Sequence, residues 1–302
     1  MKKALILSDG KIGHLNQSIA FCKIKNLNYH ILELFCEGKF NKTLSYIFDR
    51  LNIYTSILLN RKIEIKDREF FDVVVSTGSS TYYANRFLSR KFKSKSVVLM
   101  LPSGYRLGGF DYIIAQSHDN PPKLKNLIEI PINLSLPIPI EHFVPEQKAI
   151  SLIIGGNNDI FQMELQSIKR VLDYIFEKFP NHKKAVTTSR RTPKKIEKLI
   201  EGYSFDYSVI YSKDKTNPIG DFLKYSEFVF ITSDSTSMIS EAVSYGNAFV
   251  EIIKLKEKRE NSKFINLIKT LEKSNHLHIF DKNIKLKSKK IDIKNILKRV
   301  EI

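Results

Sequence analysis

The chain has 302 residues, is 42% hydrophobic and carries a formal net charge of +17, a length that allows two domains with separate hydrophobic cores. Its two cysteines, Cys22 and Cys36, form no CxxC motif, and no histidines stand at metal-ligand spacing, which excludes a disulfide framework and a zinc site and fits a reducing cytoplasm. The basic residues accompany no nucleic-acid-binding motif, so the charge indicates a lysine-rich solvated surface or an anionic membrane partner, and no nucleic acid.

The first predicted strand covers residues 4–7, an apolar run too short for a signal peptide or a membrane span. The segment SDGKIGHLNQS follows at 8–18, where Gly10 and Gly13 flank a predicted loop whose backbone amides can approach a ligand. His14 comes directly after this loop. It is either a general base, the usual role of histidine near neutral pH, or a structural residue at the start of a helix.

Four further strands are predicted in this half of the chain, at 29–34, 73–75, 97–101 and 112–115, separated by segments with helical spacing. Apolar residues also recur at helical spacing across 43–59, beside several basic residues. This pattern predicts an amphipathic helix that either packs on the sheet or lies in a membrane interface. Its apolar residues are Leu44, Ile47, Phe48, Leu51, Tyr54, Ile57 and Leu58, and its basic neighbours are Lys39, Lys42, Arg50, Arg61 and Lys62.

After a proline-bearing stretch at 131–145, a second series of strands is predicted at 149–154, 185–188, 207–211, 228–231 and 248–252. The domain boundary is therefore expected near residue 145, giving domains at 1–145 and 146–302. Both have the α/β alternation of Rossmann-like folds with parallel sheets, and we expect them to face each other across a cleft. Ligands in such sheets bind at the carboxyl ends of the strands.

Glycines and polar residues gather at those predicted strand ends. The most informative is 217–246, where an apolar run ends in Thr232 and is followed by cap-forming side chains and a helical segment that stops at Gly246. Helix N-terminal amides exposed at such a turn suit a phosphate or a carboxylate, although an ordinary capped helix has the same pattern. No GxG, Walker A, GxSxG or DxD motif occurs, which argues against dehydrogenases, kinases, serine hydrolases and metal-chelating glycosyltransferases.

Several blocks in order along nearly the whole chain resemble the bacterial relatives of the plant "elongated mitochondria" fission factor. That family is similar to GT-B glycosyltransferases, which have two facing Rossmann-like domains and commonly use no metal, and whose C-terminal domain holds a nucleotide sugar. The blocks are SDGKIGHLNQS at 8–18, FDYIIAQSHDNPP at 110–122, LIIGGNND at 152–159, TTSRRTP at 187–193, and NPIGDFL with ITSDSTSMISEAVSYG in 217–246.

The resemblance implies a donor site in the second domain. Arg190 or Arg191 would grip the diphosphate in bidentate fashion, and Thr192 with Pro193 would supply the cap and first position of a helix aimed at the same place. A solvated pair of arginines is the alternative. The implied donor-binding residues are Gly155 and Gly156 near the phosphates, Ser189, Arg190 and Arg191, Asp234 and Ser235 in the nucleotide pocket, and Glu241 on the ribose hydroxyls.

For the first domain the resemblance implies the acceptor side of the reaction, with His14 or Asp9 as the catalytic base. His118, next to Asp119, would contact the acceptor or fix a turn. The implied acceptor-side residues are Gly10, Gly13, Asn16, Gln17, Gly78 and His118. The sequence departs from the family here, because Ser79 and Ser80 replace an arginine pair after Gly78 and residues 101–104 replace an Asp-Pro-Arg turn, so the acceptor stays open.

The sequence thus predicts a metal-independent glycosyltransferase without a cofactor. It would move a sugar from a nucleotide-sugar donor to a glycolipid or polysaccharide acceptor of the cell envelope, in the cytoplasm or peripherally on the cytoplasmic face of the membrane. Two alternatives remain open: a noncatalytic adaptor on a transferase-like scaffold, as the fission role of the plant relative implies, and a nucleotide-sugar epimerase. Nucleotide binding separates the adaptor from both enzymes.

Overall fold

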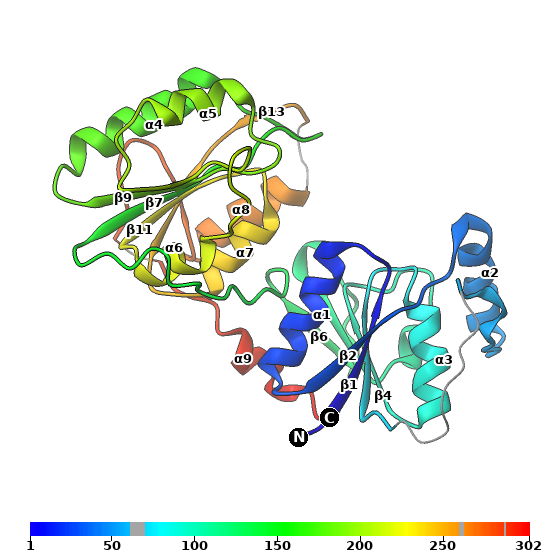
Figure 1. Cartoon of the computed structure of the whole chain (residues 1–302). Helices are drawn as coiled ribbons and strands as arrows, with labels where there is room; N and C mark the ends of the chain where they lie inside the picture. The colour runs from blue at the N-terminus through cyan, green and yellow to red at the C-terminus, as the bar shows by residue number, and fades with distance from the viewer. Residues whose placement is uncertain (61–69, 260–262, 287) are drawn as a thin grey trace. The chain divides into compact units, whose positions relative to one another are not determined.

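A computed structural model describes residues 1–60, 70–259, 263–286 and 288–302 (Figure 1). The described chain divides into two compact units, one formed by residues 1–136 with 293–302 and the other by residues 137–292. Each unit is built on one parallel six-stranded sheet. The predicted α/β fold with parallel sheets is confirmed. Among the described residues, no helix is both long and apolar enough to span a bilayer.

The sheet of unit 1 has the strand order β2-β1-β3-β4-β5-β6, and all its pairings are parallel. Its strands are β1 (Lys3–Ser8), β2 (Asn28–Glu33), β3 (Val73–Thr77), β4 (Lys95–Leu99), β5 (Tyr112–Gln116) and β6 (Leu127–Ile130). Its helices are α1 (Ile12–Ile24), α2 (Gly38–Arg50), α3 (Tyr82–Phe92) and α9 (Ile293–Ile296), with the short 3-10 helices η1 (Ser56–Leu58), η2 (Leu107–Gly109), η3 (Ser117–Asp119) and η4 (Leu297–Arg299).

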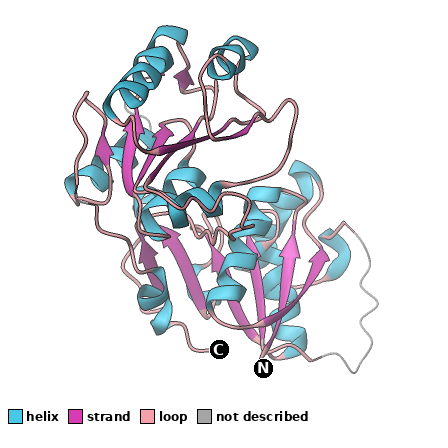
Figure 2. Ribbon diagram, turned by 60° about the vertical axis from the view of Figure 1, so that its left-hand side comes forward, coloured by secondary structure: helices cyan, strands magenta, loops and turns pink. Residues whose placement is uncertain are grey.

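The core of unit 1 follows the alternation of side chains along the strands. Leu5 and Leu7 of β1 point to the face covered by α3, where they pack with Tyr83 and Leu88 in one buried cluster. α1 covers the opposite face, so the sheet is sandwiched between helices (Figures 1 and 2). Because the strands are parallel, their carboxyl ends all lie at one edge of the sheet. The polar turns of the sequence lie at this edge.

The sheet of unit 2 has the order β10-β9-β7-β11-β12-β14 and is also parallel. Figure 1 shows α4 and α5 on one face of it and α6 and α7 on the other. Its strands are β7 (Ala149–Ile153), β9 (Lys183–Thr187), β10 (Tyr207–Val209), β11 (Phe228–Thr232), β12 (Phe249–Ile253) and β14 (His278–Ile279), with an antiparallel pair β8 (Phe161–Gln162) and β13 (Lys256–Glu257) beside it. Its helices are α4 (Leu165–Lys178), α5 (Lys194–Glu201), α6 (Ile219–Tyr225), α7 (Thr236–Ser244) and α8 (Lys263–Lys273).

The division of the chain differs from the expected boundary at residue 145. Residues 140–143 donate four backbone N–H groups to the two carboxylate oxygens of Asp221, a fully buried side chain of α6, and so are fixed to unit 2. The C-terminal residues belong to unit 1, where Lys25 donates to the carbonyl of Leu297 and Glu301 donates its N–H to Tyr112. Neither connection carries a local sequence signal.

The single helix predicted over 43–59 is wrong beyond Arg50. Asn52 adopts φ 64°, a left-handed conformation that ends a helix, and the chain continues through a turn into η1. Leu44, Phe48 and Tyr54 pack against the core cluster, whereas Ile47, Leu51 and Ile57 are exposed. Arg61 and Lys62, the basic neighbours on the far side, lie outside the described residues.

Candidate functional site

In unit 1, the candidate base lies where β1 and β3 end side by side in the sheet. Asp9 follows β1, and His14 lies in the first turn of α1. The Nδ1 atom of His14 is 3.1 Å from both carboxylate oxygens of Asp9, and Ser80 Oγ donates to Asp9 Oδ2 at 2.9 Å. We call these three side chains the Asp9–His14–Ser80 group.

Asp9 is built to stay ionised. Only 3% of its side chain is exposed, and burial alone would raise the pKa of its carboxyl. The hydrogen bond from Ser80, the charge and hydrogen bond of His14 and the N–H of Lys11 outweigh that effect, so the pKa of Asp9 lies below its usual range. An ionised, buried carboxylate is suited to orient an imidazole through Nδ1 and leaves Nε2 to accept a proton.

Gly78 makes room for this arrangement. It has φ 94°, which side chains rarely adopt, and a Cβ built there would stand 2.3 Å from Nδ1 of His14. Its N–H donates to the hydroxyl of Tyr82, which in turn donates to the carbonyl of Leu99. The glycine therefore serves the packing of the histidine ring.

Of the other residues predicted for the acceptor side, some lie where the sequence predicts and others do not. Gly10 adopts φ 77° between β1 and α1, but Gly13 lies inside α1 and not in the predicted loop, because the helix begins at Ile12. Gln17 accepts a 3.4 Å hydrogen bond from Gln116 at the end of β5, whereas Asn16 is exposed on α1. His118 lies in η3, with Nε2 3.8 Å from Asp119 Oδ1.

In unit 2, three turns meet at the carboxyl ends of the adjacent strands β9, β7 and β11. Asp234 connects them. One of its oxygens accepts hydrogen bonds from Gly156 N at 2.9 Å and Arg191 Nη2 at 2.7 Å, and the other accepts from the hydroxyl of Thr232. Burial raises the pKa of Asp234 despite these partners, which act in the opposite direction.

The two glycines after β7 are required by this network. A Cβ on Gly155 would stand 2.2 Å from a carboxylate oxygen of Asp234, and one on Gly156 would stand 2.0 Å from the carbonyl oxygen of Arg191. The neighbours that fill the space around them are protein groups. The structure therefore gives these glycines a packing role, which exists independently of any approach to phosphate.

The two arginines differ in state. The guanidinium of Arg191 is held by Asp234, whose side chain is fully buried, while Arg190 is exposed and forms no ion pair with any described residue. Thr192 does not cap α5, as the sequence had suggested: Pro193 is the N-cap, and the Thr192 hydroxyl donates to Gly155 O and accepts from Ser189 N. Of these two arginines, Arg190 is the one whose charge no carboxylate among the described residues compensates.

α7 begins as predicted. Ser235 is its N-cap, and the Ser235 hydroxyl accepts a hydrogen bond from Met238 N at 3.4 Å. Glu241 lies farther along this helix and is half-buried. The residues predicted for the donor side thus lie around one edge of the sheet, with Asp234 at the centre of their contacts and Arg190 at the surface.

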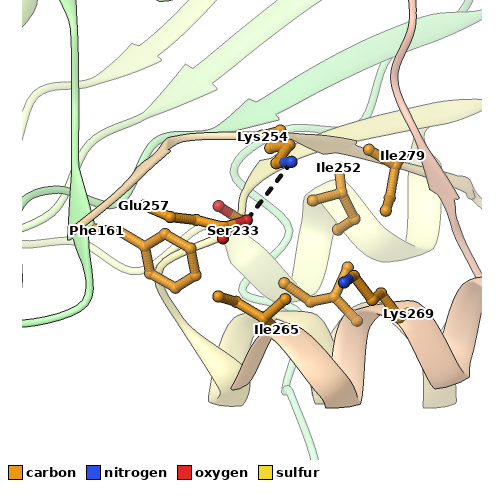
Figure 3. A pocket seen from close by; sticks show the side chains of 9 residues that line it. Phe161, Ser233, Ile252, Lys254, Glu257, Ile265, Lys269 and Ile279 are labelled. Atoms are coloured by element: carbon orange, nitrogen blue, oxygen red, sulfur yellow. Dashed lines mark ion pairs between the residues drawn. The ribbon is translucent and has the colours of Figure 1, made fainter. Parts of the chain in front are cut away.

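A small apolar pocket lies next to this network, beside Ser233 and between β12 and α8 (Figure 3). Ile252, Ile265 and Ile279 line it, and Lys254 pairs with Glu257 at 3.5 Å beside it. Its volume is about 40 Å³, room for roughly three water molecules. None of the residues predicted for the donor site lines this pocket. Among the described residues, no group of His, Cys, Asp and Glu is arranged to hold a metal ion.

Comparison with known families gives one match that spans most of the chain, the family "Mitochondrial fission ELM1", over residues 13–296. The chain belongs to the mitochondrial fission ELM1 family. One relative, "Uncharacterized protein RP120" of Rickettsia prowazekii (strain Madrid E), is 26% identical over an alignment of 290 positions, and the match covers 80% of this chain and 80% of its own. The predicted family resemblance is confirmed.

Three solved structures are similar in fold to this ELM1-family chain at low sequence identity. The MnaA–UDP co-structure of S. aureus has 12% identity and a TM-score of 0.46, and covers 94% of this chain and 85% of its own. A putative UDP-N-acetylglucosamine 2-epimerase of Listeria monocytogenes has 11% identity and a TM-score of 0.48, covering 89% and 82%. MurG of Acinetobacter baumannii has 9% identity and a TM-score of 0.48, covering 93% and 86%.

Two side-chain contacts of this ELM1-family chain were not predicted from the sequence. Ser80 appeared in the sequence only as a departure from the family's arginine pair, yet it donates to Asp9. Arg191 and Asp234 were each predicted to face the ligand, yet they face one another. A serine two positions after a strand-end glycine, near a strand-end aspartate, is a usable signal for the first contact. The second contact carries no such signal.

Proposed function

We propose that this protein is a glycosyltransferase that moves a sugar from a nucleotide-sugar donor to a hydroxyl group of a cell-envelope acceptor. The Asp9–His14–Ser80 group is the observation that carries the proposal. A histidine whose Nδ1 is fixed by a buried, ionised carboxylate is arranged as a general base, and His14 Nε2 forms no hydrogen bond with any described residue.

His14 is the base in this proposal, and Asp9 is a positioning residue. Nε2 of His14 takes the proton of the acceptor hydroxyl while the oxygen forms a bond to the anomeric carbon of the sugar. The bond from that carbon to the diphosphate breaks, and its electron pair leaves with the nucleoside diphosphate. Asp9 holds the ring and stabilises the imidazolium that forms.

The donor belongs to unit 2 in this proposal. The exposed guanidinium of Arg190 and the amide N–H groups at the start of α7 would meet the diphosphate, whose negative charge grows as the bond breaks. Arg191 and Asp234 hold the turn in shape. The proposed reaction does not require a metal ion, because Arg190 and the amide N–H groups stabilise the negative charge of the leaving diphosphate.

The acceptor is proposed to be a glycolipid or polysaccharide of the envelope. A lipid-linked acceptor would be met at the cytoplasmic face of the membrane, so peripheral association with that face belongs to the proposal. A formal net charge of +17 favours an anionic leaflet. The base and sugar of the donor stay open.

One observation favours a second function, a noncatalytic adaptor. Gly156 N, which would otherwise be available to a phosphate, is already bonded to Asp234, so the turn is complete without a ligand. An adaptor would keep this network closed and bind no nucleotide. An epimerase, in contrast, would share the donor pocket and need no acceptor.

A thermal-shift screen against nucleotide sugars and nucleoside diphosphates tests the proposal. A ligand at one hundred times its dissociation constant stabilises the folded state by roughly 2.7 kcal/mol, a readily measured shift of the unfolding temperature. A shift that Arg190→Ala reduces would support a donor site. No shift with any nucleotide would favour the adaptor.

A further inference from the structure

Helix α2 of unit 1 packs Leu44 and Phe48 on the core but also buries polar residues and leaves other apolar residues exposed. Ser45 and Asp49 on its inner side are fully buried, whereas 78% of Phe40 and 63% of Leu51 are exposed. A helix that packs on a sheet normally buries its apolar stripe and exposes its polar one. The orientation of α2 therefore needs a cause.

The cause is a set of polar anchors on the inner side. Asp49 accepts hydrogen bonds from Tyr54 Oη at 2.6 Å and from the N–H of Arg106 at 2.8 Å, and its carboxylate lies 3.8 Å from Arg86 Nε. Ser45 is 2.8 Å from the hydroxyl of Tyr105. Rotating the helix would leave these buried groups unpaired, which costs more than exposing two apolar side chains.

The outward side carries an apolar stripe. Phe40, Ile47 and Leu51 stand at positions i, i+7 and i+11, which share one helix face. In the segment that follows the helix, Ile53 and Ile57 are also exposed, at 45% and 79%. We use the name apolar stripe for these five residues. Figure 1 shows α2 beyond α3, at the outer side of unit 1.

Basic side chains border the stripe and are held in place there. Asn52, which lies between Leu51 and Ile53, accepts hydrogen bonds through Oδ1 from Arg90 Nη2 at 2.7 Å and Arg106 Nη2 at 2.9 Å. The guanidinium of Arg90 also stacks 4.3 Å from the ring centre of Tyr54. We define the basic rim as Lys39, Lys42, Arg50, Arg90 and Arg106.

The charge of the rim is largely uncompensated. Asp49 is the only carboxylate in residues 38–60, and it is buried. Arg50 and Arg90 form no ion pair with any described residue. Exposed apolar side chains and unpaired guanidiniums thus share one surface.

We propose that the apolar stripe and the basic rim form a docking surface for a membrane rich in anionic phospholipid. The stripe would enter the boundary between headgroups and acyl chains, and the rim arginines would pair with lipid phosphates, whose geometry suits a guanidinium. The stripe lies on an exposed helix face, and the exposed charged residues in 37–60 are all basic except Glu37; both features fit an anionic lipid surface. This inference gives the membrane association proposed above a place on the molecule, and it stands whether or not the chain transfers sugar.

Co-sedimentation with vesicles of phosphatidylcholine, with and without phosphatidylglycerol, tests the surface. We expect the full chain to bind the anionic vesicles and to be released by high salt, because the attraction is screened. The double variant Ile47→Ser with Leu51→Ser should lower partitioning roughly tenfold or more. Arg50→Gln and Arg90→Gln should each lower it about fivefold at low salt.

Matched controls come from unit 2. Val144→Ser changes an equally exposed apolar residue, and Lys195→Gln removes an exposed charge, and neither should alter partitioning. Stripe variants that bind like the wild type, or a wild-type chain that binds both vesicle types equally, would overturn the proposal. A wild-type dimer in sedimentation velocity that the stripe variants abolish, without vesicle binding, would overturn it in favour of a self-interface.

Discussion

The imidazole of His14 and the carboxylate of Asp9 form a paired unit, with Nδ1 3.1 Å from each carboxylate oxygen. The pair depends on residues far apart in the chain, because Ser80 holds the carboxylate and Gly78 leaves space for the ring. The sequence left open whether His14 or Asp9 is the base. In the structure His14 has a nitrogen available for proton transfer, whereas Asp9 is buried beneath the ring.

Asp9→Asn tests the positioning role. The amide cannot stabilise an imidazolium, so turnover should fall by up to about 10⁴-fold while the affinity for the donor changes little. The pH–rate profile should also change, because the lowered pKa of Asp9 keeps it ionised throughout the acidic limb in the wild type. Turnover and profile equal to the wild type would show that Asp9 has only a structural role.

Gly78→Ala should disrupt the same pair from the opposite side. The added Cβ would displace the His14 ring, and φ 94° would strain the backbone by roughly 1–3 kcal/mol, so both turnover and stability should fall. Gly108→Ala is the matched control, since no atom lies within 4 Å of its Cβ position and it should change the free energy of unfolding by less than about 0.5 kcal/mol. Chemical denaturation measures the free energy of unfolding of both variants. Equal values would contradict the close contact between Gly78 and the His14 ring.

Arg190 and Arg191 should separate binding from stability. Arg190→Ala should weaken nucleoside diphosphate binding by roughly 1.5–3 kcal/mol and leave stability unchanged, since its side chain is exposed. Arg191→Ala should lower the free energy of unfolding by about 1–3 kcal/mol, because it leaves the buried Asp234 without its cation. Calorimetry and urea unfolding measure the two effects. A loss of binding in Arg191→Ala together with a loss of stability in Arg190→Ala would instead assign the diphosphate to Arg191.

Lys290 predicts a pH dependence of stability in unit 2. Its Nζ donates to the carbonyls of Ala242 and Ala248, and burial lowers the pKa of Lys290 to about 8. Between about pH 8 and the unfolded pKa of about 10.4, Lys290 is protonated in the unfolded chain but not in the folded one. Lys290 therefore makes the folded state more stable as the pH rises through this range, by about 1–3 kcal/mol. Below about pH 8 it is protonated in both states and makes no contribution to the pH dependence.

Lys290→Met should remove that rise, and Lys289→Met, an exposed neighbour, should keep it. Urea unfolding at pH 7.5 and at about pH 10 gives the difference between the variants. A wild-type rise that persists in Lys290→Met would assign it to other groups.

Much of the fold follows from local pattern. The runs at 4–7 and 228–231 are apolar at every position, as strands buried on both faces must be, and both became central strands of parallel sheets. The strand at 127–130 was missed, because Glu129 interrupts a short apolar run. The C-terminal α9 was assigned to the wrong half, since nothing in its sequence shows that the chain returns to unit 1.

The sequence predicted at which strand ends the site residues lie, but not which of their side chains contact one another. Residue types placed Asp9, His14 and Asp234 at the correct edge of each sheet, because parallel strands bring their carboxyl ends together. The pairing of Arg191 with Asp234 depends on side-chain directions fixed only by the folded turns. Likewise, the outward apolar stripe of α2 follows from the anchoring of Asp49 by residues more than thirty positions away, such as Arg86.

Transfer of a labelled sugar tests the central claim most directly. The full chain would be incubated with labelled nucleotide sugars and a membrane extract as acceptor, and label in the lipid and polysaccharide fractions would be counted for the wild type and His14→Gln. The account predicts transfer from at least one donor, lowered on the order of 10²- to 10⁴-fold in His14→Gln with donor binding retained. Equal transfer by both proteins would contradict the role of His14, and a wild type that neither binds nor transfers any nucleotide sugar would contradict the glycosyltransferase itself.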